Sequence, residues 1–390
     1  MNRLKSIYVI VATSEWGEDM LRYRRHRLAE FLQNQKHTEE VIWLCPASLS
    51  KKGDLEKLSN DILQWPIADA GESKLFRFSR FLPVFYKKKM KPLLTYLFEK
   101  HSEYKINLWY TYPAYGNLAK MFPWNKIIYD CSDLWSQPIN GTASILASAR
   151  QKLIYSSEEK IIQKADYIAC SSPYLYDQIA ERAPEKKQAI YMYENGVEYD
   201  LFQTREKAKE LLPAYAQGPV FGYIGGIKPK LDFALIREVA KQKADWFFLF
   251  VGPDSTNQCE DFQQLLKERN VLWIGGVPSH LVPIYMNSID IGIMPYKSSS
   301  YNKAIFPLKL FEFLAAGKGV VGVNLPSTAQ YREEGVYSCL KGEDSQLFIQ
   351  ECEKFVDKIN NDSFSERRMM LAKKKDWNTI FSTMVGQIVK

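Results

Sequence analysis

Lys309 and Glu312 are two charged residues set into the apolar stretch 305–323, IFPLKLFEFLAAGKGVVGV. Because they are three residues apart, a helix would project both from one face. A lysine in the first turn of a helix, where backbone N–H groups lack helical partners, favours a phosphate. A carboxylate one turn further along can accept two hydrogen bonds from a vicinal diol such as that of a ribose. The spacing therefore fits a bound nucleotide diphosphate, and it fits equally an internal Lys–Glu ion pair.

The residues around this pair predict a buried helix followed by a strand. Pro307 suits the first helical turn, since its missing N–H would have no helical partner there. Gly317 predicts the left-handed residue that ends the helix. Residues 319–323 are a short apolar run, which is typical of a buried strand.

A second candidate phosphate loop begins at Gly225 and Gly226. The apolar run 220–224 predicts a strand before the glycines, and 233–243 predicts a helix after them, with Asp232 as its N-cap. Glycines between a strand and a helix let backbone N–H groups approach an anion closely, and Lys228 adds positive charge. A tight turn without a ligand is the alternative.

Asp130 and Asp133 lie at or just beyond the carboxyl end of the predicted strand 126–129, in the sequence YDCSDLW. Open α/β sheets bind their ligands at this end of the strands. We expect a structural role for Asp130 and a catalytic one for Asp133, which could orient or deprotonate a hydroxyl group. The alternative for Asp133 is to cap the following helix.

Basic residues crowd the first predicted helix, 20–32: Arg22, Arg24, Arg25, His26 and Arg27. For most of them we predict a solvated basic face. The alternative is that one or two line a ligand site at the carboxyl end of the first strand, 7–12. Arg25 and His26 are our candidates for that role.

The stretch 74–91, KLFRFSRFLPVFYKKKMK, has seven basic residues, no acidic residue and several aromatic ones. Aromatic and basic residues together fit docking on an anionic membrane surface. Lys87, Lys88, Lys89 and Lys91 are the head groups that we expect to contact it. In the alternative interpretation the aromatic residues face the core and the lysines stay in water.

Length and composition restrict the classes of protein to consider. The chain has 390 residues, too many for a single compact core, with 46% hydrophobic and 25% charged residues and a net charge of +7. Six scattered cysteines form no CxxC pair, so neither a zinc site nor a redox motif is predicted. We recognise no nucleic-acid-binding module and no signal peptide or membrane span. We therefore expect a cytoplasmic protein with reduced thiols.

Apolar strands alternate with helices along both halves of the chain, which predicts two doubly wound α/β domains. We place the first domain at 1–197 and the second at 198–364, with an irregular linker at 197–218. The polar loop 296–305 leads to the helix that carries Lys309. The segment 365–390 is predicted to be one amphipathic helix.

Taken together, the paired α/β domains, the Asn195-Gly196-Val197 turn, Gly225-Gly226 and the PLKLFEFLAAGKGVV segment resemble the GT-B glycosyltransferases. The sequence is most similar to the GT4-like branch of bacterial cell-envelope enzymes, including those of teichuronic acid biosynthesis. The resemblance implies two Rossmann-like domains facing across a cleft. In this arrangement the first domain holds the acceptor, the second holds the nucleotide-sugar donor, and helix 365–390 crosses back to the first domain.

The resemblance also implies roles for individual residues. Glu312 matches the second glutamate of the family's Glu-x7-Glu motif, which binds the donor ribose, while Ala304 stands where the first glutamate is usual. Lys309 matches a basic residue of the PLK variant. The residues that we expect to bind the donor are Gly225, Gly226, Lys228, Phe306, Pro307, Leu308, Lys309 and Glu312. From the strand positions and composition described above, we also expect Asp133 to be catalytic together with Lys309, and Arg25, His26, Lys87, Lys88, Lys89 and Lys91 to lie on the acceptor or membrane side.

The function implied is transfer of a sugar from a nucleotide diphosphate sugar, expected to be a UDP-sugar, to a lipid-linked cell-envelope glycan such as teichuronic acid. The expected enzyme is a retaining hexosyltransferase that uses no cofactor or metal, since the sequence has no Asp-x-Asp triplet. It is expected at the inner face of the cell membrane. The alternatives are a nucleotide-sugar 2-epimerase and a non-catalytic sugar-nucleotide binding protein.

Overall fold

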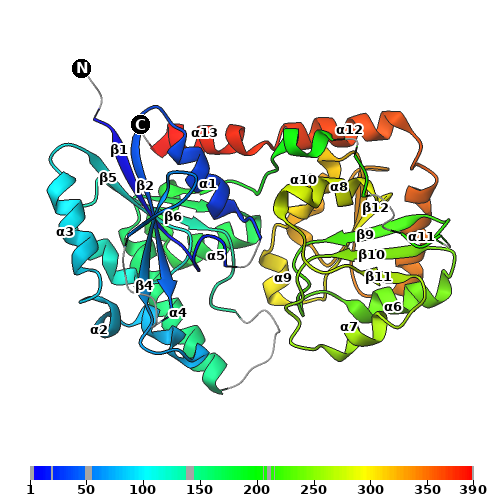
Figure 1. The fold of residues 1–390 in the computed structure, drawn as a ribbon, viewed down its shortest axis with the longest axis horizontal. Helices are drawn as coiled ribbons and strands as arrows, with labels where there is room; N and C mark the ends of the chain where they lie inside the picture. The colour runs from blue at the N-terminus through cyan, green and yellow to red at the C-terminus, as the bar shows by residue number, and fades with distance from the viewer. Residues whose placement is uncertain are drawn as a thin grey trace. The chain divides into compact units, whose positions relative to one another are not determined.

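The structure is a computed structural model that describes residues 4–18, 21–48, 55–137, 145–204, 206–208, 212–214 and 216–388. The chain folds as two compact units, both α/β (Figure 1). The first contains the chain up to Glu194 together with the last residues from Met384. The second runs from Asn195 to Thr383.

The first unit is built on an eight-stranded sheet with the strand order β3-β4-β2-β1-β5-β6-β7-β8. Its strand pairs are parallel except for the short antiparallel pair β3–β4. The central strands are apolar on both faces, as expected of parallel strands covered by helices. The strands are β1 (Ser6–Val11), β2 (Thr38–Ala47), β3 (Glu56–Lys57), β4 (Leu63–Ala68), β5 (Lys105–Tyr110), β6 (Lys126–Cys131), β7 (Tyr167–Cys170) and β8 (Ile190–Met192).

Helices connect these strands. The α-helices are α1 (Arg24–Gln33), α2 (Pro83–Tyr86), α3 (Lys91–Lys100), α4 (Ile145–Lys164) and α5 (Pro173–Arg182), and the 3-10 helices are η1 (Lys74–Phe81), η2 (Gly116–Lys120) and η3 (Pro184–Ala189).

The second unit has a six-stranded parallel sheet with the order β11-β10-β9-β12-β13-β14. In Figure 1, helix α10 lies on one side of this sheet and α6 and α7 lie on the other. The strands are β9 (Val220–Ile224), β10 (Phe247–Val251), β11 (Val271–Trp273), β12 (Ile291–Pro295), β13 (Gly319–Val323) and β14 (Tyr337–Leu340). The helices are η4 (Tyr199–Gln203), α6 (Phe233–Gln242), α7 (Glu260–Leu265), η5 (Ser279–Leu281), α8 (Val282–Asn287), α9 (Ser300–Ala304), α10 (Lys309–Ala315), η6 (Pro326–Tyr331), α11 (Ser345–Val356), α12 (Asp362–Lys373) and α13 (Trp377–Ile388), whose residues from Met384 belong to the first unit.

Both sheets reverse their strand order at one point, between β1 and β5 in the first and between β9 and β12 in the second. Doubly wound sheets bind ligands beside this switch point, at the carboxyl ends of the strands. In the second unit, the loop 225–232 after β9 and the segment 296–308 after β12 both leave the sheet there. The doubly wound architecture predicted from the sequence is therefore confirmed.

Several local predictions are wrong. The expected loop 296–305 contains α9, which begins at Ser300. The hydroxyl of its N-cap, Ser299, accepts a bond from the Asn302 backbone N–H. The expected linker 197–218 contains η4, and Phe202 within it is buried. The segment 365–390 is not one helix, because α12 and α13 are separated at residues 374–376.

Strand β4 was not predicted because it contains Gln64 and Pro66, both unusual within a sheet. Strand β3 pairs only with residues 63 and 64 of β4, so Pro66 lies beyond that pairing. A proline is tolerated where its missing N–H costs no hydrogen bond in the sheet.

Candidate functional site

The loop after β9 packs tightly against the loop after β10. The Gly225 backbone N–H donates to the Val251 carbonyl at 2.8 Å. A Cβ on Gly252, whose φ is +148°, would lie 1.9 Å from the Gly225 carbonyl oxygen. No side chain fits at Gly252, which is why glycine occurs there.

Lys309 lies beside Gly225. A Cβ built on Gly225, whose φ is +155°, would be 3.1 Å from Cε of Lys309 and 3.4 Å from the Tyr223 hydroxyl oxygen. The structure thus brings together two residues that the sequence placed in separate candidate phosphate sites. Gly226 follows in the same loop, and Lys228 lies two residues further on, half-buried.

Lys309 and Glu312 form an ion pair within α10. The Glu312 carboxylate is buried, whereas about a fifth of the Lys309 side chain is exposed. The internal pair that we gave as an alternative is therefore present. It does not replace the ligand interpretation, because the lysine lies against the glycine loop, where its ammonium group could bind a phosphate instead of the carboxylate.

Helix α10 begins at Lys309, so the prediction that Pro307 occupies its first turn is wrong. Phe306 and Pro307 are buried and Leu308 is half-buried. Phe306 stacks on Phe311 with ring centroids 5.7 Å apart. The side chains at 306 and 307 therefore build the core beneath α10, and only their backbone could face a ligand.

Asn195 fixes this segment in place, a role that the sequence did not reveal. Its Nδ2 donates to the Phe306 carbonyl at 2.6 Å, and the residue is buried. Sequence analysis identified Asn195-Gly196 only as a turn. The available signal was an asparagine in the motif that resembles the family, but its partner is more than a hundred positions away in the chain.

Asp130 lies inside β6, buried, and accepts two hydrogen bonds from Arg24 Nε at 3.0 and 2.9 Å. Arg24 Nη1 also donates to the carbonyls of Tyr193 and Glu194, at 2.8 and 3.0 Å. These contacts support the structural role expected for Asp130. The predicted solvated basic face is wrong for Arg24 and Arg27, which are both buried.

His26 is also buried and belongs to an aromatic cluster. Its ring stacks on Trp43 and meets Trp16 edge-on. Burial lowers its pKa to about 2, so the ring is neutral. Arg25 is half-buried, with its guanidinium 4.2 Å from the centre of the Tyr23 ring.

Asp133 is half-buried and lies two residues beyond the end of β6, at the carboxyl edge of the first sheet. The Ser171 hydroxyl donates to the neighbouring Ser132 carbonyl at 3.2 Å, which connects this loop to the end of β7. Asp133 belongs to the first unit, whereas Lys309 and Glu312 belong to the second.

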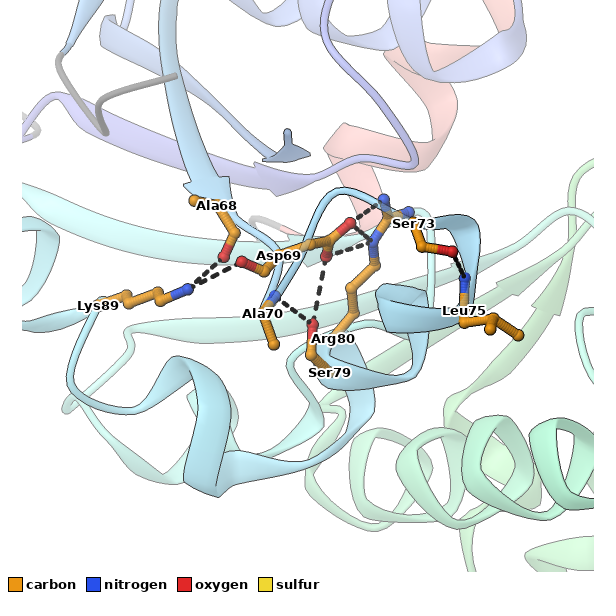
Figure 2. A network of polar contacts seen from close by, with 8 residues as sticks. All are labelled: Ala68, Asp69, Ala70, Ser73, Leu75, Ser79, Arg80 and Lys89. Atoms are coloured by element: carbon orange, nitrogen blue, oxygen red, sulfur yellow. Dashed lines mark hydrogen bonds and ion pairs between the residues drawn. The ribbon is translucent and has the colours of Figure 1, made fainter. Parts of the chain in front are cut away.

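The basic segment 74–91 is anchored by the polar network in Figure 2. Arg80 forms an ion pair with Asp69 at 2.6 Å, and Ser79 donates to the same carboxylate. Lys89 Nζ donates to the Ala68 and Asp69 carbonyls at 2.7 and 3.1 Å. The expected membrane contact of Lys89 is therefore replaced by an internal one, while Lys87, Lys88 and Lys91 are exposed.

Within the part of the chain that the structure describes, no cluster of three or more His, Cys, Asp or Glu side chains could hold a metal ion. Among the same residues, every helix is too short or too polar to cross a membrane.

Comparisons with known proteins identify the family. Residues 218–359 match the family model described as glycosyl transferases group 1. The chain is 48% identical over 378 residues to TuaH of Bacillus subtilis (strain 168), named as a teichuronic acid biosynthesis glycosyltransferase; the match covers 96% of this chain and 95% of TuaH.

Solved structures share the fold at low sequence identity. A sucrose-phosphate synthase of Thermosynechococcus elongatus matches 99% of this chain and 98% of its own, with a TM-score of 0.76 and 15% identity. HepE of Anabaena, in complex with UDP and glucose, matches all of both chains with a TM-score of 0.68 and 13% identity. WaaG, a glycosyltransferase of lipopolysaccharide biosynthesis, covers 97% of this chain and 98% of its own, with a TM-score of 0.63 and 12% identity.

These findings give no support to a 2-epimerase or to a non-catalytic sugar-nucleotide binding protein. A relative that is 48% identical over almost the whole of both chains defines the family, and the structural matches define the fold. The chain belongs to the group 1 glycosyltransferases and has the GT-B fold.

Proposed function

We propose that this glycosyltransferase moves a sugar from a nucleotide diphosphate sugar to a lipid-linked cell-envelope glycan at the inner face of the membrane. The name of its relative TuaH makes teichuronic acid the first polymer to test. The observation that carries the proposal is the convergence of Gly225, Lys309 and Glu312 beside the switch point of the second sheet.

The donor site proposed here uses three kinds of group. Glu312 accepts hydrogen bonds from the ribose hydroxyls, Lys309 binds the diphosphate, and the backbone at Gly225 and Gly226 approaches the phosphates closely. HepE, which has the same fold, was solved with UDP and glucose, and a UDP-sugar is therefore the first donor to test. Glu312 must exchange its lysine partner for the ribose when the donor binds.

In the transfer step, the bond between the sugar C1 and the diphosphate oxygen breaks and C1 bonds to the acceptor oxygen. The departing diphosphate gains negative charge, and Lys309 stabilises that charge as it develops. Asp133 orients the acceptor hydroxyl or takes its proton. The proposed reaction retains the anomeric configuration and uses no metal or cofactor. Ala304 stands where the first glutamate of the family motif is usual. In this proposal, therefore, no carboxylate at position 304 recognises the sugar.

The proposal is tested by a thermal-shift panel of UDP, GDP, ADP and dTDP sugars, followed by product analysis with a lipid-diphosphate acceptor. We expect one nucleotide class to stabilise the protein and to release its diphosphate only when acceptor is present. An epimerised donor without acceptor would contradict the transferase assignment, and binding without any turnover would contradict catalysis.

Replacing Glu312 by glutamine is expected to weaken nucleotide binding. A hydrogen bond to a charged group is worth about 1.5–3 kcal/mol, which corresponds to roughly a 10- to 150-fold increase in Kd. The measurement is calorimetric titration with UDP and with its 2′,3′-dideoxyribose analogue. The parent should lose affinity for the analogue, whereas Glu312→Gln should lose less, because its neutral amide oxygen accepts weaker bonds from the same hydroxyls.

The control for this experiment is Glu366→Gln, which neutralises an exposed carboxylate of the same unit. It should leave both affinities unchanged. Equal loss of affinity for the analogue in the parent and in Glu312→Gln would assign the ribose to another side chain.

Membrane association is supported by the surface of segment 74–91. Leu75 and Val84 are 68% and 79% exposed, and Phe76 and Phe85 are also exposed. Lys87, Lys88 and Lys91 carry their charges close by in the sequence. Exposed apolar side chains with lysines and no carboxylate within the segment fit the boundary of an anionic bilayer.

We expect the triple change of Lys87, Lys88 and Lys91 to Glu to reduce binding to phosphatidylglycerol vesicles. Each basic residue near an anionic surface contributes about 1 kcal/mol, so the partition coefficient should fall by about 100-fold at low salt. Co-sedimentation measures it. The control makes the same change of charge elsewhere in the first unit, by replacing three other exposed lysines with Glu: Lys120, Lys126 and Lys187. Equal loss in both variants would show a net-charge effect only.

A further inference from the structure

The first unit contains a cavity of about 660 Å³ that takes no part in the donor site proposed above. It lies at the carboxyl edge of the sheet, where β1, β2 and β4 end. Its size is within the range of small-molecule sites. The residues that matter here are Trp16, Glu18, Gln64, Asp69, Glu72 and Arg77, all of which line it.

We propose that this cavity binds the terminal sugar of the acceptor, and that it selects an uncharged pyranoside and disfavours a sugar acid. This inference rests on the proposed transferase function, since it names the acceptor class of that reaction. It is carried by the charge of the cavity wall and by the fixed position of one aromatic side chain.

The wall is acidic. Its carboxylates are Glu15, Glu18, Glu56, Asp69 and Glu72, and its only cationic groups among the described lining residues are Arg77 and Arg80. Asp69 and Arg80 neutralise each other in the ion pair of Figure 2. Even without Glu15, three carboxylates, Glu18, Glu56 and Glu72, then remain against the Arg77 guanidinium. A sugar carboxylate would be repelled, whereas sugar hydroxyls can donate hydrogen bonds to carboxylate oxygens.

A metal ion is a poorer occupant than a sugar. No three acidic side chains of the described chain are close enough together to bind a cation. The carboxylates are instead distributed around a cavity of sugar size, which suits a ligand with several separate hydroxyl groups.

Trp16 supplies the apolar surface that a sugar ring also needs. Its ring meets the rings of His26 and Trp43 edge-on, each at a centroid distance of 4.8 Å. Its backbone N–H donates to Gln64 Oε1 at 2.7 Å, and Gln64 Nε2 donates to Glu56 at 2.8 Å. An indole face packs well against the C–H face of a pyranose, while the polar wall receives the hydroxyls.

His26 is a positioning residue for Trp16. Its Nδ1 accepts from the Tyr23 backbone N–H at 3.1 Å, so its proton is on Nε2, which lies 3.2 Å from the Trp16 carbonyl and donates to it. Because burial keeps the ring neutral, this arrangement does not change at physiological pH. The aromatic platform is thus in place before any ligand binds, which lowers the entropic cost of binding.

The cavity also adjoins the surface proposed to meet the membrane. Gly71 lines the cavity, and a Cβ there would lie 2.5 Å from the Phe76 ring. Phe76 is part of the exposed apolar surface, and Lys89 holds the end of β4 through its hydrogen bond to the Ala68 carbonyl. A glycan attached to a lipid would present its sugar close to that surface.

The test is ligand-observed NMR on the full chain with matched methyl glycosides. The pairs are the glucoside with the glucuronide, and the galactoside with the galacturonide, so that partners differ only in oxidation at C6. We expect at least one neutral member to bind and its uronate partner to bind roughly tenfold more weakly at low salt. The difference should shrink in 1 M NaCl, which screens these charges.

Glu18→Gln combined with Glu72→Gln should reduce this preference to less than about threefold, because two repelling charges are removed while the glutamine amides still hydrogen-bond sugar hydroxyls. Both carboxylates are exposed, so the fold is not at risk. Trp16→Ala should abolish binding of both glycosides, and Trp16→Phe should retain part of it. The control Glu99→Gln, exposed on α3, should change nothing.

Three results would overturn the proposal: no neutral glycoside binds at 10 mM, the uronate binds as tightly as its partner, or Trp16→Ala leaves binding intact. These outcomes are distinct from failure of the transferase proposal. Release of UDP from a donor in the presence of a lipid-linked glycan would support transfer even if the cavity bound no glycoside. Glycoside binding, in turn, can be measured without any donor.

Discussion

Lys309→Ala is expected to lower the turnover of donor by about 10²–10³-fold, which is the usual loss when one preorganised group that stabilises developing charge is removed. The physical reason is that the departing diphosphate would lose the cation that lies against Gly225. Single-turnover measurement at saturating donor isolates this effect from binding. Lys309→Arg should recover part of the rate, since it restores the charge with a different shape.

Two controls accompany this experiment. Lys303→Ala removes an exposed lysine of α9 and should leave the rate unchanged. The thermal stability of Lys309→Ala must also be compared with the parent, because the change leaves the buried Glu312 carboxylate without this partner. A variant that is folded and turns donor over as fast as the parent would remove Lys309 from the mechanism.

Asp130→Ala is expected to lower the free energy of unfolding of the first unit by about 3–5 kcal/mol, because breaking a buried ion pair leaves an uncompensated charge. Arg24 would keep its bonds to the Tyr193 and Glu194 carbonyls but lose both bonds to the carboxylate. Urea unfolding measures the loss. It should be followed with a signal specific to the first unit, since a chain of two units need not unfold in one step.

The double variant Arg24→Met with Asp130→Leu should recover most of this stability, because neither member of the pair then leaves a charge buried at this position. Glu39→Ala, which breaks the exposed pair with Lys5, should leave the unfolding midpoint unchanged. If Asp130→Ala also unfolded at the parental urea concentration, the pair would have no structural role.

Most strands were predictable because a buried strand appears in the sequence as a run of apolar residues. The prediction for 220–224 agrees with β9 and that for 319–323 with β13. The misses have local causes. Strand β4 carries Gln64 and Pro66, α9 has only five residues, and the break between α12 and α13 coincides with the Val197–Lys375 hydrogen bond, which no local pattern reports.

Basic residues were the hardest to interpret from the sequence. Arg24, Arg27 and Lys89 are as polar as the exposed Lys87, yet their head groups bind a buried carboxylate or backbone carbonyls. A long side chain is assigned to water or to the interior by partners that come from other elements. The four lysines of segment 74–91 therefore looked equivalent, and the structure separates Lys89 from the others.

The sequence by itself determined the alternation of strands and helices, the charged pair on α10 and the basic, aromatic segment, because each depends on residues close together in the chain. Only the tertiary structure placed Gly225 against Lys309, paired Arg24 with Asp130 and assembled the acidic cavity around Trp16. Periodicity fixes which face of an element is buried, but the order of strands in the sheet fixes which loops meet at its edge. A binding site formed by several loops is therefore a property of the topology, and no single stretch of residues contains it.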